Sequence, residues 1–192
     1  MKGSSTMFET GNPGSKAEII SELDRLNTQI AEFAKTIPAD EFITPQAEFW
    51  SPAEHIRHLI KSVRPVAMAL KIPKIMLLFK FGSTKRPGYS FDKIKEMYYS
   101  KLREGATAGR FTPSTKNQAG NPVEWQKNVI KNWVSVSQLL TTNMNSWPEK
   151  KLDTYLLPHP LLGNLTIREM LFFTLYHNKH HASRIVERRE IS

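Results

Sequence analysis

Residues 50–63 read WSPAEHIRHLIKSV, and this stretch carries a complete signal for the start of a helix. Ser51 and Glu54 have the spacing of a capping box, and Pro52 occupies the first helical position. Apolar residues then recur at helical spacing, at Ala53, Ile56, Leu59, Ile60 and Val63. The stretch therefore predicts an amphipathic helix that begins at Ser51, and Pro65 is expected to kink or end it because proline lacks an N–H.

The same signature, a capping residue followed by apolar residues at helical spacing, predicts four more helices over 15–37, 90–103, 121–142 and 166–189. The intervening segments are polar or rich in Pro and Gly, and we expect loops over 40–49, 82–88, 104–120 and 147–165. No long stretch alternates as a strand would, so the sequence predicts an all-α class. The long helices suggest an antiparallel four-helix bundle with long inter-helix connections, forming a single domain over residues 16–192.

Composition excludes several classes of protein. The chain of 192 residues has no cysteine, so disulfides, thiolate metal ligands and a cysteine nucleophile are all excluded. Residues 1–15 contain no apolar run of the kind found in secretory signals, and we expect them to form a flexible leader. The longest apolar stretch, residues 65–81, is interrupted by lysines and is too short for a membrane span. We therefore expect a soluble, cytoplasmic protein.

The basic excess is concentrated in one part of the chain. The formal net charge is +9, and residues 57–103 alone contribute +10, with twelve Lys or Arg against Asp92 and Glu96. Such a segment can attract an anionic small molecule, a membrane surface or nucleic acid, or it can be an ordinary solvated face. Nucleic acid is the less favoured partner, because no helix-turn-helix or other nucleic-acid-binding signature is present.

Histidines provide the main functional signal. Five of the six lie in two of the predicted helices, at His55, His58, His177, His180 and His181; the sixth is His159. His177 and His181 stand four residues apart, so their side chains share a helix face and could hold one divalent ion. The residue after His177 is Asn178, which removes the glutamate that a zinc metalloprotease would need there. A third ligand should come from another helix, and His58 either faces the interior for this purpose or lies on the surface beside Arg57 and Lys61.

Two motifs resemble a known family. Residues 50–60 are similar to the W-S-x-x-E-x-x-x-H-L signature of the DinB-like superfamily, which includes the YfiT-type proteins. Residues 160–169, PLLGNLTIRE, resemble that family's entry to its last helix, and residues 177–181 supply its H-x-x-x-H. The resemblance implies a four-helix bundle in which His58, His177 and His181 bind a divalent metal. Three histidine ligands suit zinc or nickel first and iron or manganese next. The resemblance also implies a homodimer and leaves His55 and His180 as bystanders.

The resemblance implies a metal-dependent enzyme, either a hydrolase or a thiol-dependent S-transferase acting on a small molecule. Without cysteine, any thiol must arrive with the substrate, and an anionic thiol would suit the basic segment. Metal-bound water would be the catalytic group, with Glu54 as a weaker candidate because its capping role already explains it.

One alternative is a non-enzymatic binding module that docks an anionic partner through residues 57–103. Another is a bundle whose metal is structural or absent. Residues 64–88 depart from the family pattern, which leaves the pocket shape and the substrate open.

Overall fold

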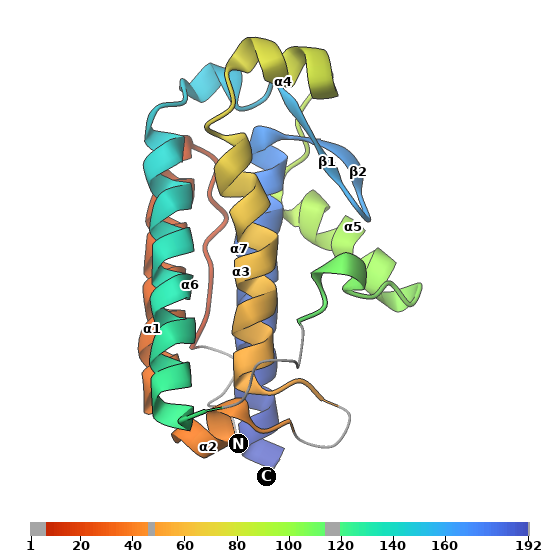
Figure 1. Ribbon diagram of the computed structural model, residues 1–192. Helices are drawn as coiled ribbons and strands as arrows, with labels where there is room; N and C mark the ends of the chain where they lie inside the picture. The colour runs from red at the N-terminus through yellow and green to blue at the C-terminus, as the bar shows by residue number, and fades with distance from the viewer. Residues whose placement is uncertain (1–6, 46–48, 114–119, 192) are drawn as a thin grey trace.

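The computed structural model describes residues 7–45, 49–113 and 120–191, and most of them are helical (Figure 1). Four long helices lie side by side: α1 (Lys16–Thr36), α3 (Pro52–Ala69), α6 (Pro122–Asn145) and α7 (Ile167–Ile191). Helices α1 and α3 each pack against both α6 and α7. The core between them is apolar and includes the fully buried Trp133, and the predicted all-α class is confirmed in this coarse form.

The long helices do not all alternate in direction. Helices α1 and α7 run one way, and α3 and α6 run the other way (Figure 1). The Asn143 side chain donates to the Ala67 carbonyl at 2.7 Å and so ties the ends of the parallel helices α3 and α6 together. The helices of the pair α3–α6 are thus parallel, as are those of the pair α1–α7, whereas the sequence suggested a wholly antiparallel arrangement. The reason is the long excursion between α3 and α6, which returns the chain to the end where α3 began.

Helix α3 continues through Pro65 to Ala69, so the proline does not end the helix, which was one of the two outcomes expected of it. The residues beyond the proline keep the helix in place because Val66, Ala67 and Leu70 are buried in the core. Their burial offsets the loss of the hydrogen bond that Pro65 cannot donate to the Lys61 carbonyl, and the bond from Asn143 satisfies the Ala67 carbonyl near the end of the helix.

Several short elements occupy segments expected to be loops or connections. Helix α2 (Ala39–Ile43) buries Phe42 completely, although residues 40–49 were expected to be a loop. Strands β1 (Leu156–His159) and β2 (Gly163–Thr166) form an antiparallel hairpin inside the expected connection 147–165. The hairpin is stable there because Leu157 and Leu165, which are register partners, are both buried against the core. The remaining short helices are α4 (Lys74–Phe81), α5 (Phe91–Arg103), η1 (Gly109–Phe111) and η2 (Glu149–Lys151).

Residues 7–15, which belong to the expected leader, have contacts with the long helices α1 and α7. Phe8 is buried and meets the ring of Phe33 edge-on at a centroid distance of 5.6 Å. Glu9 forms an ion pair with Lys179 at 2.9 Å. Residues 1–6 of the expected leader lie outside the described part of the chain.

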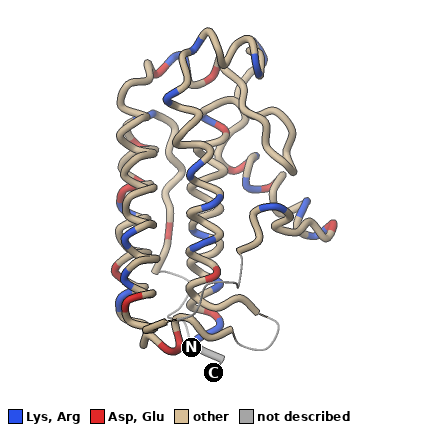
Figure 2. Tube along the Cα trace, in the orientation of Figure 1, with Lys and Arg blue, Asp and Glu red and all other residues tan. Residues whose placement is uncertain are grey.

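The basic segment is divided over three elements. Residues 57–103 comprise most of α3, all of α4 and α5 and the connections between them, and Lys and Arg positions occur along this whole stretch (Figure 2). In the part of the chain that the structure describes, no helix combines the length and apolarity that crossing a bilayer requires.

Candidate metal centre

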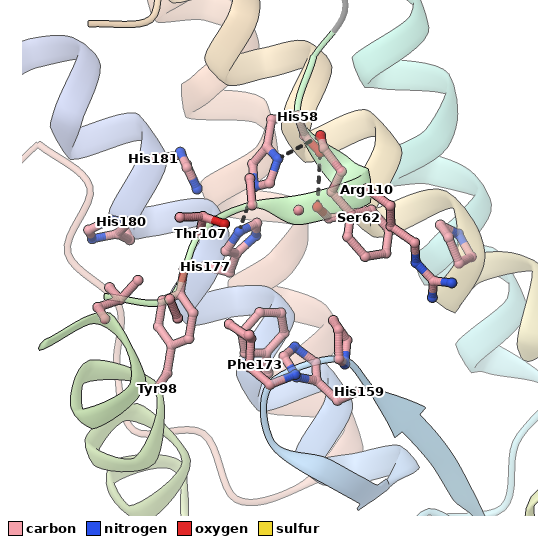
Figure 3. Close-up of a pocket in the computed structure, with 18 of the residues that line it drawn as sticks. His58, Ser62, Tyr98, Thr107, Arg110, His159, Phe173, His177, His180 and His181 are labelled. Atoms are coloured by element: carbon pink, nitrogen blue, oxygen red, sulfur yellow. Dashed lines mark hydrogen bonds between the residues drawn. The ribbon is translucent and has the colours of Figure 1, made fainter. Parts of the chain in front are cut away.

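Three buried histidines converge between α3 and α7. The ligand nitrogens of His58, His177 and His181 all lie within 4.8 Å of one another. His58 Nε2 and His177 Nε2 are 3.0 Å apart, and Figure 3 shows the two rings directed toward each other. The structure thus brings together the three residues that the sequence and the family resemblance singled out.

Capping bonds define where each of the two antiparallel helices that carry the histidines begins. In α3, the Glu54 carboxylate accepts from the Ser51 N–H at 2.8 Å and the Ser51 hydroxyl accepts from the Glu54 N–H at 3.2 Å, so the capping box is complete. In α7, Glu169 accepts from the Thr166 N–H at 2.8 Å, and Thr166 accepts in return. These caps set the residue at which each helix begins, and the packing of α3 against α7 then brings the histidine-bearing faces together.

Glu169 also fastens α7 to the chain before α5. Its carboxylate is fully buried and receives two hydrogen bonds from the Arg86 guanidinium, at 2.6 and 2.7 Å, and one from the Tyr89 N–H at 2.8 Å. Burial alone would raise the pKa of Glu169, but these bonds and the one from Thr166 outweigh burial and lower the pKa. The helix start that positions His177 and His181 thus rests on a buried ion pair.

A backbone carbonyl fixes the tautomer of His58. Its Nδ1 lies 3.1 Å from the carbonyl oxygen of Phe111, which can only accept. The ring proton therefore sits on Nδ1, and Nε2 presents its lone pair toward His177. This is the arrangement by which metal-binding histidines are usually oriented.

His55 supports His181 in a similar way, in contrast to the bystander role that the resemblance implied. The two Nδ1 atoms are 2.9 Å apart, so one ring donates to the other. If His181 is to present Nε2 as a ligand, its Nδ1 must carry the proton and His55 must accept it. Burial lowers the pKa of His55 to about 3, so His55 remains neutral and able to accept.

Trp50 joins the histidine cluster from the turn before α3. Its ring contacts His55, the fourth residue of the helix, at a centroid distance of 5.4 Å, which is the contact of a hydrophobic staple. It also lies over His58 at 5.1 Å and stacks on His181 at 5.9 Å. The same side chain therefore staples the helix and forms a wall beside the histidines.

The three histidines have the charge state that metal ligands need. Burial lowers the pKa of His58, even though its bond to the Phe111 carbonyl acts in the opposite direction. Burial also holds the pKa of His177 and His181 well below the ordinary value of 6.5, and the neighbouring imidazoles reinforce this effect. All three rings are therefore neutral near pH 7, as metal ligation requires.

The spacing of the nitrogens also suits a divalent ion. Zinc–nitrogen bonds are about 2.0–2.1 Å long, so two nitrogens in a tetrahedral site lie about 3.3–3.4 Å apart. The two Nε2 atoms of His58 and His177 are close to that separation, and the third nitrogen lies within 4.8 Å. The histidine group could therefore hold a metal ion.

The histidines border a cavity of about 810 Å³. Its walls are mainly apolar and come from α3, α5, α7, the hairpin and residues 106–111 (Figure 3). Arg110 lines the cavity and is itself exposed, whereas Tyr98 is buried, which raises its pKa to about 12. A cavity of this volume can enclose a small-molecule substrate.

Residues 106–111 are the part of the site that sequence reasoning missed. The polar, Gly-containing segment 104–120 was expected to be a long loop. Its described part passes over the site, where Phe111 bonds His58 and Arg110 lines the cavity. No periodicity or motif in this segment predicts these contacts. The rest of the expected loop, residues 114–119, lies outside the described residues.

Three other polar residues near the site, Glu54, His159 and His180, differ in whether they line the cavity. Glu54 is buried at the start of α3, where it caps the helix, and it does not line the cavity. His180 and His159 both line it. His159 Nδ1 accepts from the backbone N–H groups of Leu161 and Leu162, each at 3.1 Å, and so holds the turn of the hairpin.

These features define a class of helical proteins with a histidine triad at one side of a mainly apolar cavity. The family model of the DinB superfamily matches residues 22–185, and the chain therefore belongs to the DinB superfamily. No curated protein matches the chain, and neither does any solved structure.

Proposed function

We propose that this protein is a metal-dependent enzyme, a hydrolase or a thiol-dependent S-transferase, whose divalent ion is held by His58, His177 and His181. The observation that carries the proposal is the convergence of three neutral, buried imidazoles beside a cavity of small-molecule size. Zinc or nickel would suit the three nitrogens best, and iron or manganese would also be compatible. The fold is interpreted as a four-helix bundle with long connections, and a cytoplasmic homodimer stays a prediction.

When bound, the ion would supply Lewis acidity and lower the pKa of a coordinated water or thiol. The chain's own contribution is to hold the three imidazoles neutral and to exclude bulk water with apolar walls. Among the described residues, no Asp or Glu lines the cavity, which leaves Glu54 to its capping role. Proton transfer therefore falls to an imidazole rather than to the Tyr98 phenol on the same lining, whose pKa burial raises to about 12. We assign it to His180, which lines the cavity beside His181 and whose pKa is lowered by burial.

The cavity favours an anionic, partly apolar substrate. Arg110 is an exposed cation on its lining, and the remaining lining is mainly apolar. Because the chain has no cysteine, a thiol in the reaction would be part of the substrate or cosubstrate. An anionic low-molecular-weight thiol combines these properties.

Metal titration and two probe reactions test the proposal. Protein without a histidine tag, stripped with chelator, is expected to take up one zinc or nickel ion per chain. The loaded protein should then hydrolyse p-nitrophenyl acetate or transfer glutathione to chlorodinitrobenzene faster than the stripped protein. Failure to bind either ion would contradict the metal centre. Full loading without turnover in a wider set of esters and thiols would favour the alternative, a non-enzymatic module that docks an anionic partner through residues 57–103.

Replacing His55 with alanine is expected to weaken metal binding by about 10- to 100-fold, the usual cost of losing a residue that orients a ligand. The substitution removes the acceptor for His181 Nδ1 and so frees that ring to turn. Chelator-competition titration measures the affinity. His55→Gln, which keeps an acceptor, should recover part of it, whereas His180→Ala should leave it near the wild-type value. Equal affinities in all four proteins would show that His55 has no positioning role.

A further inference from the structure

Helix α4 carries an exposed apolar face. It lies across one end of the long helices, opposite the end where α7 finishes (Figure 1). Leu77 points into the core and is fully buried, while four large apolar residues of the same helix are exposed: Ile75, Met76, Leu78 and Phe79. Phe79 is 85% exposed, and Ile75 and Met76 are each 57% exposed. On a helical wheel the four occupy one continuous arc, which we name the α4 apolar face.

Lysines border the α4 apolar face on both sides. Around the helix, Lys74 follows Leu78 at one edge of the arc and Lys80 follows Met76 at the other. Lys71 and Lys85 lie just before and just after the helix and are exposed. The chain has no Asp or Glu from residue 55 to residue 91.

Carboxylates of the neighbouring connection and of α7 do not neutralise these lysines. Glu149 and Asp153 are both paired with Arg168, at 2.6 and 2.7 Å, and Glu169 is paired with Arg86. The end of the molecule that carries α4 therefore combines an apolar face with a cationic border.

We infer that α4 docks on the surface of an anionic lipid bilayer, a function separate from the metal centre. The α4 apolar face would enter the boundary between headgroups and acyl chains, and the lysines would meet the anionic headgroups. A soluble polyanion would use the lysines and leave four apolar side chains in water. A second copy of the chain would bring two lysine borders of like charge together. An anionic bilayer accommodates both the α4 apolar face and the lysines. This docking takes place at the bilayer surface and requires no membrane-spanning helix.

Vesicle co-sedimentation tests the inference. The full chain is expected to sediment with vesicles of equal parts phosphatidylglycerol and phosphatidylcholine, and much less with phosphatidylcholine alone. Added salt should weaken the binding, because the lysine contribution is screened. The double variant Ile75→Ser/Phe79→Ser should bind at least about tenfold more weakly, since burial of one such side chain already changes an equilibrium by that much. Lys71→Gln/Lys80→Gln should lose the preference for phosphatidylglycerol.

Matched controls come from the opposite end of the molecule. Val123→Ser removes an exposed apolar residue at the start of α6, and Lys127→Gln removes a lysine of the same helix; both should bind like the wild type. Equal sedimentation of the wild type and the Ile75/Phe79 variant would overturn the inference. A second outcome would also overturn it: the wild type forms a dimer in light scattering, the Ile75/Phe79 variant is a monomer, and neither binds vesicles. The α4 apolar face would then join two copies of the chain.

Discussion

Replacing His177 with alanine is expected to abolish stoichiometric metal binding, with a loss of affinity greater than about 100-fold. That figure is the upper end for losing a residue that merely orients a ligand, and His177 is assigned as a ligand itself. Its Nε2 faces His58 Nε2 at 3.0 Å, and its pKa is held well below 6.5 mainly by burial. Elemental analysis of protein dialysed against zinc or nickel, followed by removal of free metal, measures the content per chain.

A second readout separates lost ligation from lost folding. Metal that binds only the folded state raises its melting temperature, so the wild type should show a metal-dependent rise and His177→Ala should not. His177→Gln preserves more of the buried volume if the alanine variant is unstable. His180→Ala is the matched control, because it lies in the same helix and lines the same cavity. Wild-type metal content in His177→Ala would refute the proposed site.

Replacing Glu169 with alanine is expected to lower the free energy of unfolding by about 3 kcal/mol. Removing one partner of a buried ion pair costs about 3–5 kcal/mol, because the other charge is left uncompensated. The lower end applies here since the Arg86 side chain is 31% exposed and can turn toward water. The Tyr89 and Thr166 N–H groups also lose their acceptor. Denaturant unfolding measures the change, and the melting temperature should fall by about 6–12 °C.

Acid sensitivity gives the same prediction an independent test. Because the folded-state pKa of Glu169 is lowered, its stabilising effect is complete above the ordinary value near 4.5 and is lost as the pH falls through the folded-state value. The alanine variant should therefore lose less stability than the wild type between about pH 5 and the acid limit of folding. Glu96→Ala, which removes the exposed partner of Lys93, should change little. A Glu169 variant as stable and as acid-sensitive as the wild type would contradict the role of the pair.

The helix starts could be predicted from the sequence because they depend on local interactions. Caps were expected at Ser15, Ser51, Ser90, Asn121 and Thr166, and the helices begin at the residue after each of them. A capping bond joins residues two or three apart, so its partners are visible in a short stretch of sequence. The i, i+4 spacing of His177 and His181 placed both on one face of α7 for the same reason.

The assignment of His58 to the triad depended on the family resemblance. The sequence pattern alone did not show whether the His58 side chain faces the interior or the surface. The structure shows why: His58 lies 119 positions before His177, and only the packing of α3 against α7 brings the rings together. The bond from Phe111 and the contact of His55 with His181 are equally long-range. Periodicity within one helix carries no information about such contacts.

The sequence by itself thus determined the helical class, the helix starts, the histidine pair on α7 and the location of the basic segment. Tertiary structure alone decided that α3 passes through Pro65, that Leu157 and Leu165 pair in a hairpin, and that residues 106–111 cover the site. It also decided that α4 buries Leu77 and exposes Phe79, which one apolar run could not distinguish. The first set depends on neighbours within a helical turn, whereas the second depends on which distant surface each residue meets when the chain is packed.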